Sequence, residues 1–268
     1  AKTTKMPSKT KLCPYCDEEI KANAKKCKHC GEWLEEKPTS SGTTIIQAFA
    51  SQYEILEEVG RGGMSVVYKA RQVNLDRIVA LKIVPKELTH DKEFTIRFKK
   101  EARDGANLNH PNIITIHDSG EIGGYPFMAL EYLEGGTLSQ RIREKGIFSE
   151  QQIKDILVPI LDGLEYAHDK GLIHRDIKSS NIMFDGKGRP VLMDFGIAKS
   201  VEGTRLTKTG TYMGTPEYSS PEQADSEMDV DHRTDIYSLG VVGYEMATGK
   251  VPFTAENPLN VLKDVTTK

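Results

Sequence analysis

This chain has few cysteines and places all of them near one end. The four cysteines lie between Cys13 and Cys30, and none follows in the rest of the 268 residues. No apolar run approaches the roughly 18 residues that a membrane span needs, and the basic N-terminal stretch lacks the apolar core of a secretory signal. A net charge of −3 is too small to indicate nucleic acid as a partner. We therefore expect a cytoplasmic protein without a membrane segment in this chain.

The abrupt end of cysteine use indicates two modules. With 38% hydrophobic and 28% charged residues, the chain has the composition of a globular protein that can build a real core. We expect a small metal-binding module in residues 1–34, a linker in residues 35–51 and one large domain in residues 52–268. The Ser-Ser-Gly run at residues 40–42 indicates that the linker is flexible. The apolar residues that follow this run predict that the second half of the linker docks on the large domain.

Two Cys-x-x-Cys pairs lie ten residues apart, Cys13 with Cys16 and Cys27 with Cys30. Each pair can offer two thiolates to adjacent corners of a tetrahedron, so together they can close a structural Zn²⁺ site. Metal binding, roughly 10–16 kcal/mol in comparable peptides, would stabilise a module that is too small to fold alone. Two disulfides, a redox-active pair or His29 as a ligand are the alternatives. The segment resembles short prokaryotic zinc ribbons, which implies a structural cap or a contact with a protein partner.

A second pattern lies in the middle of the large module. Residues 174–181 read HRDIKSSN, and the triplet Asp194-Phe195-Gly196 follows thirteen residues after Asn181. This is the layout of a protein-kinase catalytic loop followed by a metal-binding loop. Phosphoryl transfer needs a carboxylate to receive the hydroxyl proton of the substrate and oxygen ligands to hold Mg²⁺ or Mn²⁺ on the phosphates. Asp176 suits the first role, and Asn181 with Asp194 suits the second.

The upstream sequence contains the parts that such a site requires. A glycine-rich turn within residues 53–70 lets backbone amides approach phosphates without interference from a Cβ atom. The string Val-Ala-Leu-Lys ends in Lys82 and reads as a short apolar strand that carries one lysine toward the phosphates. Glu101 lies in a stretch with helical spacing of apolar residues, and we predict that it forms an ion pair with Lys82.

From Tyr53 onward the chain resembles bacterial serine/threonine protein kinases of the eukaryotic-like (Hanks) type, with motifs over nearly the whole large module. The resemblance implies an α+β, two-lobed fold with an antiparallel β-sheet N-lobe and a mainly helical C-lobe. Lys178, two residues after Asp176, is the serine/threonine form, and Thr215 would brace both side chains. The sequence stops before the last helices of such a domain. We expect that it is an excerpt of a longer protein, or else that the lower lobe is completed by something else.

The resemblance also implies a set of site residues. The catalytic residues are Lys82, Glu101, Asp176 and Lys178. Leu130 would guard the back of the adenine pocket, and backbone groups of Glu131 and Leu133 would bond the adenine edge. The residues of the ATP and metal site as a whole are Val59, Gly60, Gly62, Gly63, Val67, Ala80, Lys82, Leu130, Glu131, Leu133, Asn181, Met183 and Asp194.

Regulation is implied by the segment after Asp194. Arg175 precedes the catalytic aspartate and, by resemblance, receives a phosphate from this segment. Thr207 and Thr209 stand at the offsets before Thr215 at which bacterial relatives are autophosphorylated, although they could be ordinary polar loop residues. Phosphorylation in trans would make a second copy of the chain a partner. Asp235, on the next helix, should accept hydrogen bonds from the backbone of the catalytic loop.

The sequence therefore predicts an ATP- and Mg²⁺-dependent kinase that acts on protein serine and threonine hydroxyls and is activated by autophosphorylation. The alternative is a pseudokinase or scaffold that binds nucleotide and recruits partners through the zinc ribbon. The presence of every catalytic residue favours the kinase. Gly105 favours the alternative, because a larger apolar residue often stands there and joins the core between the lobes. The early end of the kinase module also favours the alternative.

Overall fold

The computed structural model describes residues 10–12, 19–21, 24, 40–62, 65–195, 216–225, 230–255 and 257–267. The chain divides into two compact units, residues 1–48 and residues 49–268, and each is described by itself. In the first unit, β1 (Thr10–Leu12) pairs antiparallel with β2 (Glu19–Lys21). The four cysteines lie outside the described residues, so the zinc site stays a prediction.

A helix occupies the second half of the segment that we expected to be a linker. Helix α1 (Ser40–Phe49) includes the Ser-Ser-Gly run and ends at an aromatic residue that is fully buried. The ring of Phe49 lies 5.5 Å from that of Phe127 and 6.2 Å from that of Tyr53. Aromatic pairs at this spacing stabilise a contact beyond their buried area. The end of α1 is therefore held by tertiary packing, which outweighs the local preference of serine and glycine for loops.

The second unit begins with a five-stranded antiparallel sheet in the order β3-β4-β5-β7-β6. Its strands are β3 (Tyr53–Arg61), β4 (Val66–Gln72), β5 (Arg77–Ile83), β6 (Ile116–Ile122) and β7 (Tyr125–Glu131). Buried and more exposed side chains alternate along β4, as the two-residue period of a strand requires. Lys82 of β5 lies opposite Val67 of β4 and Met128 of β7. The sheet therefore carries this lysine on its central strand.

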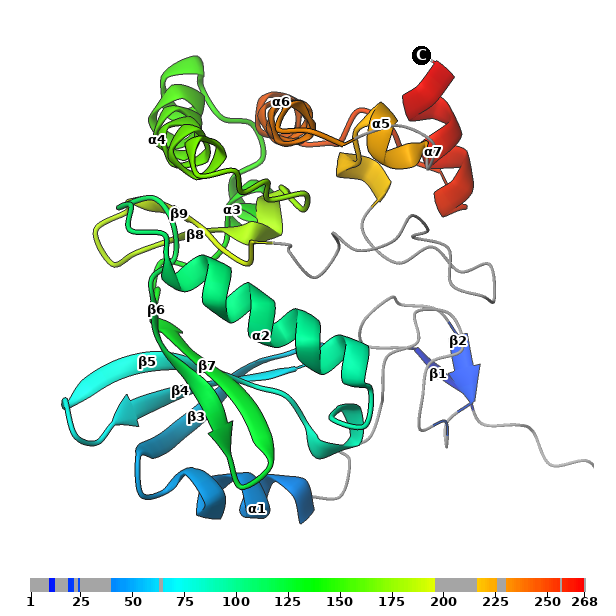
Figure 1. The fold of residues 1–268 in the computed structure, drawn as a ribbon. Coiled ribbons are helices and arrows are strands. Elements are labelled where there is room, and N and C mark those ends of the chain that lie inside the picture. Colours follow the sequence, from blue (N-terminus) through cyan, green and yellow to red (C-terminus); the bar gives the residue numbers. More distant parts are fainter. Residues whose placement is uncertain are drawn as a thin grey trace, which may run out of the picture. The chain divides into compact units, whose positions relative to one another are not determined.

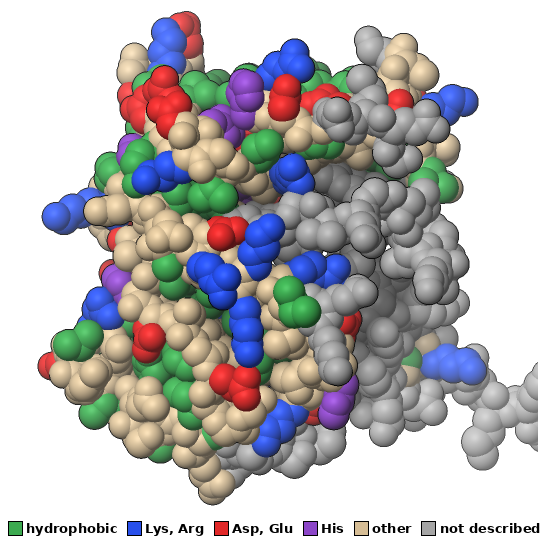
Figure 2. Space-filling view, in the orientation of Figure 1, with side chains coloured by type: hydrophobic (Ala, Val, Ile, Leu, Met, Phe, Trp, Pro, Cys, Tyr) green, Lys and Arg blue, Asp and Glu red, His purple; other side chains and the backbone are tan. Residues whose placement is uncertain are grey.

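Helix α2 (Lys92–Ala106) lies along this sheet and contacts β6 and β7 (Figure 1). Asp91 caps its first turn, because the carboxylate accepts a hydrogen bond from the amide of Phe94. Phe98 and Ala102 are buried in the apolar cluster under the helix. Lys and Arg side chains gather over the same helix on the face drawn in Figure 2. The helix thus turns an apolar stripe to the sheet and basic residues to solvent.

The chain leaves the sheet through a tight crossing after β7. The amide of Gly135 donates to the carbonyl of Phe184 at 2.8 Å, and the amide of Phe184 donates to the carbonyl of Gly136 at 3.0 Å. A Cβ atom at Gly135 would lie 2.7 Å from the Cβ of Phe184 and 2.8 Å from the carbonyl oxygen of Asp185. Only glycine lets the two backbones approach this closely.

The rest of the second unit is mainly helical. Its helices are α3 (Leu138–Lys145), α4 (Glu150–Asp169), α5 (Pro221–Ala224), α6 (Arg233–Thr248) and α7 (Pro258–Thr267). The small hairpin is β8 (Ile182–Phe184) with β9 (Pro190–Leu192). The 3-10 helices in the described part of the unit are η1 (Lys86–Leu88), η2 (Ser179–Asn181) and η4 (Pro216–Tyr218). Capping boxes at Thr137, Ser149 and Ser220 begin α3, α4 and α5.

The core of this helical part joins α4 and α6 to the hairpin. Its fully buried side chains include Ile160, Leu164, Ile182, Leu192 and Val242. The arrangement confirms the predicted two-lobed α+β fold, with a sheet lobe and a helical lobe. None of the helices in the described part of the chain is both long and apolar enough to cross a bilayer.

Candidate active site

The centre of the site is a lysine held between two carboxylates. Nζ of Lys82 donates to Oε1 of Glu101 on α2 at 3.2 Å and to Oδ1 of Asp194 at 2.8 Å. The predicted ion pair between strand and helix is therefore present. Burial opposes the charge of Lys82, but the two carboxylates outweigh burial and raise the pKa of the lysine. All three residues come from different elements, so this contact links the sheet, α2 and the segment after β9.

The pKa values of the two carboxylates are shifted in opposite directions. The ammonium group of Lys82 lowers the pKa of Asp194, which keeps this carboxylate ionised. Burial raises the pKa of Glu101 and outweighs the attraction of Lys82. The side chain of Asp194 is 46% exposed, whereas that of Glu101 is only 14% exposed. Asp194 is therefore the carboxylate that can exchange its lysine contact for a cation.

Residues of the HRDIKSSN string form a second polar group. Nζ of Lys178 lies 3.2 Å from Oδ2 of Asp176. Nδ2 of Asn181 donates to the carbonyl of Asp176 at 2.8 Å and to its Oδ2 at 3.2 Å. Because the amide nitrogen of Asn181 is used in this way, its side-chain oxygen is the atom that it can offer to a cation. Amide and carboxylate oxygens are the ligands that Mg²⁺ prefers, so Asn181 and Asp194 fit such an ion.

A buried aspartate of α6 (Arg233–Thr248) holds the backbone of this loop. Asp235 of α6 accepts hydrogen bonds from the amides of His174 at 2.8 Å and Arg175 at 2.7 Å, as predicted. Its Oδ2 also lies 2.8 Å from Nε2 of His168 on α4. Arg175 has a φ of 63°, in the left-handed region, which L residues enter at a cost of about 1–3 kcal/mol. The contacts with Asp235 stabilise the loop in this strained form.

His174 connects the catalytic loop to the segment that carries Asp194. Its Nε2 lies 2.7 Å from the carbonyl oxygen of Met193, and its Nδ1 lies 3.2 Å from the amide of Asp176. A carbonyl can only accept and an amide can only donate, so in these contacts Nε2 is the donor and Nδ1 is the acceptor. The ring also lies 4.7 Å from that of Phe195. The sequence alone had indicated no role for His174, although it begins the recognised string.

An apolar cluster lies beside these polar groups. Ala80, Leu130 and Leu133 are buried in one cluster with Met128, and Val67 and Met183 pack against it. The structure thus brings together five of the residues that we assigned to the ATP site. The amide of Glu131 donates to the carbonyl of Thr115 at 2.9 Å. Of the backbone groups of Glu131, only the carbonyl could therefore bond an adenine.

The glycine-rich turn is described in part. The amide of Gly62 donates to the carbonyl of Ser65 at 2.9 Å, and Val59 is 45% exposed. Among the described residues, no atom other than those of Gly60 and its two chain neighbours lies within 4 Å of where a Cβ of Gly60 would stand. This side of the turn is therefore open to a ligand. Gly63 lies outside the described residues, as do Thr207, Thr209 and Thr215.

Gly105 does not leave a large gap between the lobes. A Cβ atom there would lie 2.6 Å from Cδ1 of Ile116, so the isoleucine of β6 fills the space that a larger residue at 105 would need. A cavity of about 20 Å³ remains between Glu101, Gly105, Leu130 and Phe195. This is room for about one water molecule. The glycine is therefore matched by packing from a neighbouring strand, which the sequence alone did not indicate.

The sequence alone also gave no indication of a contact that Tyr218 of η4 makes with the catalytic loop and α6. The hydroxyl of Tyr218 donates to Oε2 of Glu245 at 2.7 Å and lies 3.0 Å from Oγ of Ser179. Burial, together with the carboxylate, raises the pKa of Tyr218. This contact joins η4, which follows the segment of Thr207 and Thr209, to η2 of the catalytic loop and to α6. Local sequence carries no signal for it, because the partners are far apart in the chain.

Comparison with known proteins agrees with this geometry. Residues 53–268 match the family described as the protein kinase domain. A probable serine/threonine-protein kinase of Clostridium perfringens is 44% identical over 217 residues, which cover 81% of this chain and 32% of that protein. The serine/threonine-protein kinase PknB of Mycobacterium leprae is 40% identical over 217 residues, covering 79% of this chain and 35% of that protein. The serine/threonine-protein kinase PknL of Mycobacterium tuberculosis is 40% identical over 211 residues, covering 79% and 53%. The chain spans about a third of the first two relatives and about half of the third.

Proposed function

The chain belongs to the protein kinase family and carries a serine/threonine-protein kinase domain, and from this premise we propose that the protein transfers the γ-phosphoryl group of ATP to serine and threonine hydroxyls of other proteins. One observation carries the proposal. Lys82 bridges Glu101 of α2 and Asp194 of the segment after β9. This contact supports the proposal, because phosphoryl transfer in kinases uses a lysine fixed by a helix glutamate near a carboxylate that binds Mg²⁺.

Each polar side chain of the site then has a role. Lys82 holds the phosphates, and its contact with Glu101 fixes the position of its ammonium group. Asn181 and Asp194 offer oxygen atoms to Mg²⁺, which neutralises the charge on the phosphate oxygens when it is bound. Asp176 receives the proton of the attacking hydroxyl. Nζ of Lys178 lies 3.2 Å from that carboxylate, and its positive charge stabilises the negative charge of the phosphoryl group during transfer.

The apolar cluster serves the base of the nucleotide. Ala80, Leu130 and Met183 exclude water from the adenine, and the carbonyl of Glu131 accepts a hydrogen bond from its amino group. Binding the adenine in a fixed place orients the phosphates toward Lys82 and Asp176. Positioning of this kind and the fixed charges supply most of the catalysis in phosphoryl transfer.

Activation is proposed to depend on phosphorylation of the segment after Asp194. A phosphate on Thr207 or Thr209, delivered by a second copy of the chain, would pair with the guanidinium of Arg175. Asp235 fixes the strained backbone of Arg175, so the guanidinium is carried by a rigid segment of the loop. Ordering of the segment would then place Thr215 beside Asp176 and Lys178.

Incubation of this chain with ATP and Mg²⁺ is expected to add phosphoryl groups in steps, as measured by intact mass spectrometry, with the first sites at Thr207 or Thr209. A variant with both Thr207→Ala and Thr209→Ala should phosphorylate an added protein substrate on the order of tenfold more slowly, a typical size for a coupling between two sites. The matched control is Thr266→Ala, because the exposed Thr266 hydroxyl bonds the carbonyl of Lys263 in its own helix.

Two outcomes of this experiment would contradict the proposal. Full activity of the double variant would show that these threonines do not activate the enzyme. Nucleotide binding with no transfer to the chain or to the added substrate would instead indicate a scaffold that binds nucleotide without using it.

We further propose that Cys13, Cys16, Cys27 and Cys30 hold one structural Zn²⁺ in a ribbon that contacts another protein. Metal analysis should find one zinc per chain, and a Cys13→Ser/Cys16→Ser variant should contain almost none, because a tetrahedral site needs all four ligands. The phosphorylation rate should change by less than about twofold, since residues 49–268 form a unit of their own. A chain without zinc and without free thiols after denaturation would indicate two disulfides instead.

A further inference from the structure

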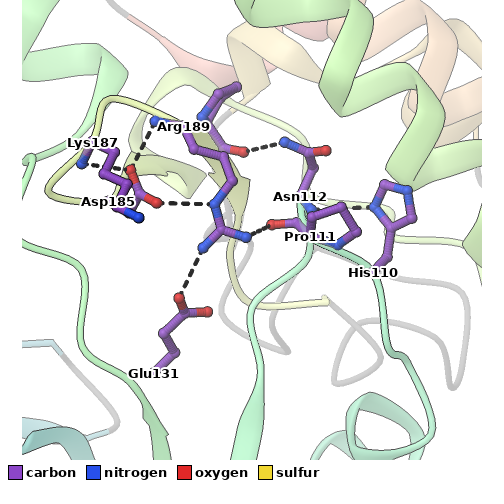
Figure 3. A network of polar contacts seen from close by, with 8 residues as sticks. His110, Pro111, Asn112, Glu131, Asp185, Lys187 and Arg189 are labelled. Carbon is purple, nitrogen blue, oxygen red and sulfur yellow. Dashed lines mark hydrogen bonds and ion pairs between the residues drawn. The ribbon is translucent and has the colours of Figure 1, made fainter.

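One arginine outside the catalytic group joins three distant parts of the chain (Figure 3). Nη2 of Arg189 donates to Oε1 of Glu131 at 3.0 Å, and Nε donates to Oδ2 of Asp185 at 3.0 Å. Nη1 donates to the carbonyl of Pro111. The partners lie at the end of β7, in the turn before β9 and in the segment between α2 and β6. A guanidinium can make these contacts at once because its donors form a fixed planar fork.

Two of the three parts are already fixed to each other by other bonds. The amide of Leu192 donates to the carbonyl of Asn112 at 2.8 Å, and the amide of Ile114 donates to the carbonyl of Leu192 at 2.9 Å. The buried side chain of Asn112 donates to the carbonyl of Pro190 at 2.7 Å. The segment around residue 112 and strand β9 therefore act as one body. Arg189 adds a side-chain contact from this body to the end of β7, beside the backbone bond from Glu131 to Thr115.

The turn that carries Arg189 is itself fixed by Asp185. Oδ1 of Asp185 accepts from the amides of Lys187 at 2.9 Å and Arg189 at 2.8 Å, which fixes the turn between β8 and β9. The side chains of Arg189 and Glu131 are 34% and 26% exposed. A partly shielded, charge-assisted pair of this kind is stronger than an exposed one.

Glu131 is thus held on two sides. Its amide donates to the carbonyl of Thr115, and its carboxylate accepts from Arg189. Its remaining backbone group is the carbonyl, which the proposed function assigns to the adenine. The direction of that carbonyl depends on both contacts.

We propose that Arg189 is a positioning residue for the nucleotide, which acts through Glu131 by fixing the backbone that receives the adenine. The inference rests on the proposed function, because it takes ATP as the ligand of the apolar cluster. In the described part of the chain, the side chain of Arg189 contacts Asp185, Pro111 and Glu131, which the proposed function assigns neither to the phosphates nor to the reacting hydroxyl. Its loss should therefore weaken nucleotide binding and leave the transfer step nearly unchanged.

The test compares Arg189→Met, Glu131→Met and the double variant, since methionine keeps much of each side chain's volume and lacks the charged groups. Each single variant should bind both adenosine and ATP roughly three- to tenfold more weakly by calorimetry, as expected for loss of one partly exposed hydrogen bond that acts on the nucleotide through the backbone. The double variant should be no weaker than the weaker single variant, because both remove the same contact. The rate at saturating ATP should stay within about twofold, while KM for ATP rises.

A second measurement needs no nucleotide. Hydrogen exchange of the free protein should become faster at the amides of residues 131–135 in both single variants. The matched control is Arg143→Met, an exposed arginine whose side chain bonds Ser139 on its own helix. Arg189→Lys should recover part of the affinity, because a lysine can reach Glu131 but cannot bond three partners.

Each result bears on the proposal separately from the proposed function. Unchanged adenosine affinity and unchanged exchange in both single variants would overturn it, as would independent, additive effects in the double variant. If Arg189→Met fails to fold, Glu131→Met decides, since it leaves the bonds from Arg189 to Asp185 and Pro111 in place. If the unmodified chain binds no nucleotide, the proposed function fails. The exchange measurement would then still show whether Arg189 holds the end of β7.

Discussion

Replacement of Asp176 by asparagine is expected to lower the rate of phosphoryl transfer roughly 10²- to 10⁴-fold, the usual contribution of a positioned general base. Asparagine keeps the shape of the side chain and can still accept from Asn181. It cannot take up the proton of the attacking hydroxyl. The measurement is the initial rate of phosphate incorporation into an added protein at saturating ATP, together with the affinity for ATP by calorimetry.

Binding and transfer should separate in this variant. The affinity for ATP should change little, because the cluster around Ala80 and the contact between Lys82 and Glu101 are untouched. The matched control is Asp162→Asn on the exposed face of α4, which should keep both properties. If the Asp176→Asn variant had an unchanged rate at saturating ATP, Asp176 would have no part in the transfer step. The rate at saturating ATP does not depend on the affinity for ATP, so a change of affinity could not mask a slower transfer step.

The polar part of the site could be read from the sequence because its residues stand in short strings. The spacing of Asp176, Lys178 and Asn181 within one loop is fixed by the backbone, and Asp194 follows at a short distance. The pairing of Lys82 with Glu101 was predicted from the lysine motif and the helical spacing around Glu101. The resemblance supplied the support from Asp235. It also predicted that Ala80, Leu130 and Met183 would meet, although more than a hundred residues separate the first from the last.

Contacts without a local signal could not be read in this way. Arg189 follows a polar turn and looks like an ordinary solvated residue, and its partners Pro111 and Glu131 are 78 and 58 residues away. The packing of Ile116 against Gly105 is another example, since it depends on how β6 approaches α2. In both cases tertiary structure decides where a side chain goes, and propensity does not.

Helix α1 shows the same limit at the level of secondary structure. Its Ser-Ser-Gly run favours a loop, because serine bonds its own backbone and glycine is flexible. The helix nevertheless includes this run and ends with Phe49 buried among aromatic rings. Composition alone indicated that an apolar residue in this segment would dock, but it did not indicate the conformation that would present it.

Replacement of Asp235 by alanine should cause a large loss of stability, a reduction of the free energy of unfolding by about 3–5 kcal/mol. The carboxylate is almost completely buried and has three hydrogen-bonding partners, the amides of His174 and Arg175 and the ring of His168. Alanine leaves these groups without an acceptor in a place that water does not reach. Urea unfolding followed by circular dichroism measures the change.

The loss should exceed that of a neutral hydrogen bond from the same helix. Ser238 lies one turn further along α6 and donates one bond to the carbonyl of Tyr218, so Ser238→Ala should cost only about 1 kcal/mol. Asp235→Asn separates stability from catalysis, because it keeps one acceptor oxygen but turns an amide group toward the other backbone amide. At a temperature at which the Asp235→Asn variant is folded, its transfer rate should still fall by up to about 10²-fold. Asp176 follows directly on the two residues that Asp235 holds, and a shift of about 1 Å in its position is enough for such a loss. If Asp235→Ala were no less stable than Ser238→Ala, the loop would be held by His174 and its contact with Met193, and Asp235 would be a buried charge without a structural function.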